Sequence, residues 1–155
     1  MPHRDPQQQF NAVEELLTRW LKERRELLGK YTEIAVGMDG MLDQEALDLR
    51  QRALCQQLVD YVSSGHFEVY LELFEEAESF ADGSNSNAVA AKLMPAIVDT
   101  TEIIMAYEEK YTSQDSDKAK VKRDLSSLGE VLESRFLLED RLIAGLHNSH
   151  RRQQS

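Results

Sequence analysis

Apolar residues recur every three or four positions along almost the whole chain, and this spacing constrains the fold more than any other feature. It is the period of an amphipathic α-helix, whereas a half-buried strand would alternate at every second position. No alternating stretch is long enough to suggest a sheet, and we find no repeats. The pattern therefore predicts an all-α protein.

Glycine and N-cap residues divide the pattern into segments. The first helix should run from about Phe10 to Val36, with Gly37 placed to end it. After a short loop over 38–42, Asp43 is a plausible N-cap for a second helix from about Gln44 to Val62. The inward positions expected in these two helices are Phe10, Val13, Leu17, Trp20, Leu27, Tyr31, Ile34, Leu47, Leu54, Leu58 and Tyr61.

A break follows the second helix at Ser63–Gly65. Glycine is weak inside helices, so the break predicts a kink or a tight corner before a third segment over His66–Phe80. The clearest loop of the chain comes next, at Asp82–Asn87. The inward positions expected in the third segment are Phe67, Tyr70, Leu71, Phe74 and Ala77.

Two more long helices complete the chain. One is expected over Ala88–Thr112, where Pro95 either kinks it or starts a new helix. A polar loop over Ser113–Asp117 precedes the last helix, which should end near His147, with 150–155 fraying. Their inward positions are Leu93, Ile97, Ile104, Tyr107, Tyr111, Val121, Leu125, Leu128, Leu132, Leu142 and Leu146. Long amphipathic helices joined by short loops predict an up-and-down antiparallel bundle.

Length and composition fit a single globular domain over residues 1–155, with an ordered core at about 10–147. The 155 residues are 41% hydrophobic and 30% charged, and no apolar run is long enough for a membrane span. The first residues lack the apolar core of a signal peptide. Cys55 is the only cysteine, which fits a reducing cytosol. We expect a cytoplasmic protein.

The net charge of −10 is unevenly distributed. Residues 1–38 contribute zero, residues 39–78 contribute −8 from ten acids and two bases, and residues 79–155 contribute −2. Such a chain repels nucleic-acid phosphates, so direct binding of DNA or RNA is not expected. The acidic stretch either keeps the chain soluble or attracts a basic protein surface.

Three charged residues occupy positions where the helical spacing places apolar ones. Arg24 follows Trp20 on the inward stripe of the first helix, and Arg135 and Glu139 follow Leu132 on that of the last. An unpaired charge buried there would be strongly destabilising. We therefore expect these groups to be paired, hydrogen-bonded or next to a solvent-filled cleft; Arg135 and Glu139 can pair along their own helix.

The sequence alone does not decide which residues lie next to these three charged side chains. Asp60 and His66 flank the break in the middle of the chain and are candidate partners for Arg24. Alternatively, the stripe of the last helix is wider, Phe136 and Ile143 face the core, and the charged side chains lie at its edge with buried stems. Under either reading they are candidates for a functional patch.

Motifs for catalysis and metal binding are not found. None of the four histidines has a glutamate three residues before it, as helical bundles with two metal ions require. His147 and His150 have metal-compatible spacing, which is a weak signal near a terminus. No phosphate loop, nucleophile elbow or Cys–His dyad is present, and Cys55 is interpreted as a packed side chain. We predict no enzymatic activity, cofactor or metal.

His66 supports one alternative function. Histidine phosphotransfer domains are also helical bundles, with an exposed histidine that accepts a phosphoryl group and usually a lysine and a glycine shortly after it. Here Phe67 and Glu68 follow, no lysine is near, and the glutamate would repel an incoming phosphate. A phosphotransfer-type signalling bundle stays the alternative hypothesis.

Four blocks of residues between about 10 and 147 carry a resemblance. They are Arg19-Trp20-Leu21 with Arg24, Leu27-Leu28 and Tyr31; Cys55-Gln56 with Leu58-Val59-Asp60-Tyr61, Ser64-Gly65-His66-Phe67 and Tyr70; Ala91-Lys92 with Pro95 and Ile104-Met105; and Gly129-Glu130, Leu132-Glu133, Arg135-Phe136, Leu138-Glu139-Asp140 and Leu142-Ile143. In these blocks the chain resembles the Rsd/AlgQ family of bacterial anti-sigma factors, also called regulators of sigma D. The termini and the loop over 36–42 do not match.

The resemblance implies a helical bundle that binds region four of the housekeeping sigma factor. That domain reads promoter DNA and is basic; occupying it weakens the hold of sigma on core polymerase and favours alternative sigma factors. The family-pattern residues, as a partner-binding or central polar patch, are Trp20, Arg24, Asp60, Tyr61, His66, Phe67, Arg135, Phe136, Glu139 and Asp140. We expect the first and the two phenylalanines to pack, and Arg24, Asp60, His66, Arg135 and Glu139 to form a polar centre.

Overall fold

The computed structural model describes residues 5–40, 42–80, 83–113 and 117–148, and within these ranges every regular element is helical. In chain order the elements are α1 (Pro6–Gly37), α2 (Gln44–Ser64), the π-helical turn η1 (Gly65–Val69), α3 (Tyr70–Ser79), α4 (Gly83–Ser113), α5 (Lys118–Ile143) and a second π-helical turn, η2 (Ala144–Asn148).

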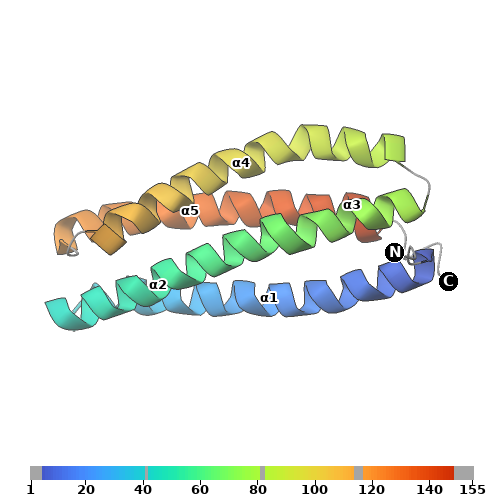
Figure 1. Ribbon diagram of the computed structural model, residues 1–155. Helices are drawn as coiled ribbons and strands as arrows, with labels where there is room; N and C mark the ends of the chain where they lie inside the picture. The colour runs from blue at the N-terminus through green and yellow to red at the C-terminus, as the bar shows by residue number, and fades with distance from the viewer. Residues whose placement is uncertain (1–4, 41, 81–82, 114–116, 149–155) are drawn as a thin grey trace.

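The helices form four long arms that run up and down (Figure 1). α1 is the first arm; α2, η1 and α3 follow one another as the second; α4 is the third; α5 with η2 is the fourth. Each arm runs opposite to the one before it, and α1 packs on α2 and α3 while α4 packs on α2 and α5. The predicted all-α antiparallel bundle is confirmed.

Aspartates begin three of the helices. Asp5 caps α1 in a reciprocal capping box with Gln8, so this helix starts several residues before the predicted Phe10. Asp43 caps α2 as predicted, accepting from the backbone N–H of Ala46 at 2.8 Å. Asp117 caps α5, accepting from the backbone N–H of Ala119 at 3.0 Å.

The predicted inward stripes of the first, second, fourth and last helices form the core. Every one of those positions is buried except Tyr31, which is half-buried and donates to the carbonyl of Leu125 at 2.9 Å. Because the stripes are long and continuous, the core extends along the bundle axis.

The third segment differs from the prediction. Phe67 and Leu71 were placed inward, but their exposed fractions are 68% and 56%. The predicted break of the second arm at Ser63–Gly65 is confirmed: it is the π turn η1, through which the chain passes from α2 to α3 without a tight corner. A π turn holds more residues than an α turn, so the inward positions advance in steps of four through it. The buried series is Tyr61, Gly65, Val69, Leu73 and Ala77.

The start of α4 also differs from the prediction, whereas the end of the last arm is close to it. α4 already begins at Gly83, so most of the predicted loop is helical, and α4 continues through Pro95 to Ser113 without a new start. α5 and η2 reach Asn148, close to the predicted end. The remaining parts of the predicted loops, at 41, 82 and 114–116, and the predicted fraying over 150–155 lie outside the described residues.

Candidate partner-binding site

The interior of the bundle contains a polar centre organised around Glu139, whose side chain is fully buried on α5. Its Oε1 accepts from the Tyr61 hydroxyl at 2.6 Å and from Nη2 of Arg24 at 3.3 Å. Its Oε2 accepts from the Tyr70 hydroxyl at 2.6 Å and from Nε of Arg135 at 3.1 Å. These five residues are called the polar centre below.

The donors around Glu139 favour its ionised form. The Tyr61 hydroxyl accepts from Nε of Arg24 at 3.1 Å, and the Tyr70 hydroxyl accepts from Nη2 of Arg135 at 3.1 Å, so both hydroxyl protons are directed to the carboxylate. Burial raises the pKa of Glu139 above its ordinary value, and the two arginines and two tyrosines reduce that upward shift without cancelling it. A carboxylate satisfies all four donors, and a carboxylic acid does not.

Arg135 is bound on its other side by α4. Its Nη1 donates to the hydroxyls of Thr101 and Thr100 at 2.6 and 3.1 Å and to the carbonyl of Ile97 at 3.4 Å. Only 1% of its side chain is exposed. Arg135 therefore links α4 and α5, and its charge is balanced inside the bundle rather than in solvent.

Arg24 connects the polar centre to the surface. Its Nη1 donates to Oδ1 of Asp140 at 2.8 Å, and that aspartate is exposed. The guanidinium carbon lies 4.6 Å from the centroid of the Phe136 ring and 5.4 Å from that of the Trp20 ring, in cation–π range. The Trp20 ring in turn stacks on Tyr61, with centroids 5.0 Å apart.

The structure brings seven of the ten predicted site residues together. They are Trp20, Arg24, Tyr61, Arg135, Phe136, Glu139 and Asp140. Arg135 and Glu139 point into the bundle, so the alternative in which they lie at its edge is wrong.

The other three predicted residues lie outside the polar centre. Asp60 is exposed and accepts from Nε2 of Gln56 at 3.0 Å, one turn away on its own helix, so it is not a partner of Arg24. His66 is exposed on η1 with its ring edge-on to Phe67, and it does not join the polar centre either. The expectation that Phe67 packs inside is wrong, because the π turn rotates this ring to the surface.

A second buried polar cluster was not predicted from the sequence. His147, on η2, contacts Glu76 of α3 through Nδ1 and Glu14 of α1 through Nε2, the latter at 2.6 Å, and its ring stacks on Phe10. Burial lowers the pKa of His147, but the two carboxylates outweigh it and the net shift is upward. The available signal was spacing, since His147 follows Glu139 by two helical turns on one stripe.

The exposed surface over η1 and α3 is acidic and partly apolar. A groove between this segment and α1 is lined by Phe67 and Leu71, by the acids Glu15, Glu68, Glu72 and Glu75, and by Ala12, Leu16 and Arg19. We call the two apolar residues and four acids the acidic face. Like charge is concentrated beyond the groove as well: burial raises the pKa of Glu23, and Glu68 and Asp60 add to that shift.

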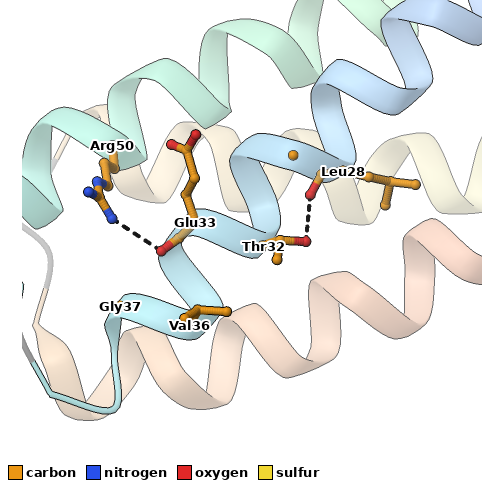
Figure 2. A pocket seen from close by; sticks show the side chains of 7 residues that line it. Leu28, Thr32, Glu33, Val36, Gly37 and Arg50 are labelled. Atoms are coloured by element: carbon orange, nitrogen blue, oxygen red, sulfur yellow. Dashed lines mark hydrogen bonds between the residues drawn. The ribbon is translucent and has the colours of Figure 1, made fainter.

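Another groove lies further along α1, toward the loop to α2 (Figure 2). It has a volume of about 600 Å³ and is lined by α1 residues and Arg50 of α2, whose Nη1 donates to the carbonyl of Glu33 at 3.2 Å. Val36 is its most exposed apolar side chain, at 69%. With one acid and one base in its lining, this groove lacks the charge concentration of the acidic face.

Metal sites and membrane spans were sought in the described residues. Within them, no group of three or more histidine, cysteine or acidic side chains is arranged to hold a metal ion. No helix in the same ranges is long and apolar enough to cross a bilayer.

Fold and site together define a class of protein: an all-helical bundle with a buried Arg–Glu–Tyr network and an acidic, partly apolar outer face. A comparison of the sequence with family models adds the specific assignment. Residues 3–147 match the Rsd/AlgQ model, described as the regulator of the RNA polymerase sigma(70) subunit, and the chain belongs to this family. The family is thus one of regulators of a transcription subunit.

Relatives agree with this assignment. The chain is 36% identical over 142 residues to the regulator of sigma D of Yersinia pseudotuberculosis serotype O:1b (strain IP 31758), covering 88% of this chain and 82% of the relative. It is 36% identical over 144 residues to that of Yersinia enterocolitica serotype O:8, covering 88% and 83%. It is 38% identical over 135 residues to that of Enterobacter sp. (strain 638), covering 83% and 78%. No solved structure shows a significant match.

Proposed function

We propose that this protein is an anti-sigma regulator that binds region four of the housekeeping sigma factor in the cytoplasm. Binding lowers the use of that sigma factor by RNA polymerase and favours alternative sigma factors. The family and its relatives support the sigma partner. The choice of region four rests on the resemblance described above and on charge.

The observation that carries the proposal is the acidic face. Phe67 and Leu71 expose 68% and 56% of their surface, and four glutamates line the same groove. Exposed aromatic side chains at the centre of a surface are typical anchors of protein interfaces. An acidic rim around an apolar pair suits a basic, DNA-reading domain, because opposite charge accelerates encounter and excludes acidic partners.

The polar centre has a different role in this proposal. Four of its members are buried and Arg24 is half-buried, so they hold the helices in register while the partner contacts the exposed residues. Asp60 and His66, which lie outside the centre and are exposed, belong with the binding surface. Asp140, at the outer end of the Arg24 link, is exposed as well.

Calorimetry with an isolated region-four fragment tests the proposal. The wild-type chain should bind at low salt, and a Phe67→Ala, Leu71→Ala double variant should bind at least about tenfold more weakly because the apolar anchors are lost. Leu137→Ala is the matched control, since Leu137 is 55% exposed on α5, away from the acidic face. A wild-type chain that does not bind the fragment would refute the proposal.

A further inference from the structure

Tyr61 and Tyr70 lie nine positions apart, yet both donate to the same carboxylate. In a regular α-helix nine positions correspond to about two and a half turns, which would put the two rings on opposite faces. Here the Tyr61 hydroxyl lies 2.6 Å from Oε1 of Glu139 and the Tyr70 hydroxyl lies 2.6 Å from Oε2. The π turn η1 lies between the two tyrosines and brings both rings to one side.

The same turn determines what the protein presents to solvent. Its two ends, Gly65 and Val69, are buried, whereas His66, Phe67 and Glu68 between them are exposed. The glycine allows the turn to lie close to the aromatic core, because a Cβ there would be 3.2 Å from the Trp20 ring and 3.3 Å from the Tyr70 hydroxyl. The segment around η1 therefore contributes to both: Tyr70 to the polar centre, and Phe67 and Glu68 to the acidic face.

We propose that Glu139 is a positioning residue for partner binding: it holds Tyr61 and Tyr70 together across η1 and so keeps the π turn that presents Phe67. π turns are rare and need such support, since the α-helical register competes with them. The inference deepens the proposed function and rests on it for the identity of the partner. The exposed ring then depends on a carboxylate buried on a different arm of the bundle.

The experiment separates positioning from general stability by using two hydroxyls at different places in the bundle. Tyr70→Phe removes one bond to Glu139 and keeps the ring. Tyr111→Phe is its matched control, because the Tyr111 hydroxyl donates to Oδ2 of Asp124 at 2.5 Å, away from η1. Amide hydrogen exchange over 65–69 and affinity for the region-four fragment are measured for both variants, with Glu139→Gln as the stronger perturbation.

We expect amide exchange over 65–69 to accelerate about tenfold in Tyr70→Phe, and the affinity to fall by a similar factor, with both unchanged in Tyr111→Phe. Wild-type exchange rates at 65–69 in Tyr70→Phe would overturn the role of Glu139 in holding the turn. Faster exchange with unchanged affinity would overturn its role in presenting Phe67. If the wild-type chain does not bind the fragment, the proposed function fails. The exchange rates would still test whether Glu139 stabilises the π turn.

Discussion

Arg135 and Glu139 lie one turn apart on α5, and Nε of Arg135 donates to Oε2 of Glu139 over 3.1 Å. Their side chains are 1% and 0% exposed, so neither charge is stabilised by solvent. A buried ion pair holds a fold together mainly through the penalty of losing one partner, because the remaining charge is then uncompensated.

Arg135→Met and Glu139→Gln should each lower the free energy of unfolding by about 3–5 kcal/mol. The double variant should lose less than the sum of the two, because each single change strands the other group. Urea unfolding measures all three. Lys122→Met is the control, since Lys122 and Asp39 form an exposed pair at 3.9 Å whose loss should leave stability unchanged. Strictly additive losses would contradict the account.

Two glycines in the middle of helices should respond in opposite ways to alanine. A Cβ at Gly29 would meet no atom within 4 Å, so Gly29→Ala should stabilise the protein by about 0.5–1 kcal/mol. A Cβ at Gly129 would lie 2.3 Å from the Tyr31 hydroxyl, which donates to the carbonyl of Leu125. Gly129→Ala must displace that hydroxyl and should destabilise the protein by about 1 kcal/mol.

Thermal unfolding distinguishes the two glycines. Introducing Tyr31→Phe removes the atom nearest to the new Cβ and leaves the ring carbon Cζ at 3.0 Å, so the penalty of Gly129→Ala should shrink in that background. An equal penalty with and without the hydroxyl would show that the close approach is not its cause.

His147 should make stability depend on pH. Its folded pKa is raised above the ordinary value of 6.5 by Glu76 and Glu14, against the effect of burial. A group with a raised folded pKa contributes fully below its unfolded pKa and loses that contribution as the pH rises through the folded pKa. His147→Gln should therefore reduce stability more at about pH 6 than at about pH 9.

The pH prediction is checked by urea unfolding of wild type and variant at both values. A penalty for His147→Gln that grows toward alkaline pH would show that the buried ring is neutral when folded.

The parts of the fold that depend on regular spacing could be predicted from the sequence. Arg135 and Glu139 were placed inward because they continue the stripe of Leu132, and both are buried. Phe67 was placed inward by the same rule and is exposed, because it lies in the middle of η1, between the buried ends Gly65 and Val69. Spacing arguments assume an unbroken α-helix; Ser63–Gly65 marked where that assumption fails, but not that a π turn would form there.

The predicted pair of Arg135 with Glu139 within one helix is confirmed, whereas the pairs between helices were not predicted. Asp60 was a reasonable partner for Arg24, but Glu139 and Asp140 of α5 take that place because the bundle brings α1 and α5 together at this level. Glu76 is buried against His147 for the same reason, since a long-range contact decides which polar side chains can be satisfied inside.

The position of the acids should matter as well as their number. Glu68→Lys with Glu75→Lys should slow association with the region-four fragment by about tenfold and change dissociation less. Glu130→Lys with Glu133→Lys changes the net charge equally but at exposed positions of α5, and should have a smaller effect. Stopped-flow rates at several salt concentrations measure both. Equal slowing by the two pairs, or salt-independent association, would leave the acidic face no specific role.

The most direct measurement is an NMR titration of the isotope-labelled chain with unlabelled region-four fragment at low salt. The account predicts shift changes that cluster on η1 and α3 around Phe67, Glu68, Leu71 and Glu75, with smaller changes on the facing part of α1. A spectrum that does not change, or changes confined to α4 and α5, would contradict the claim that this acidic face covers the promoter-reading domain of sigma.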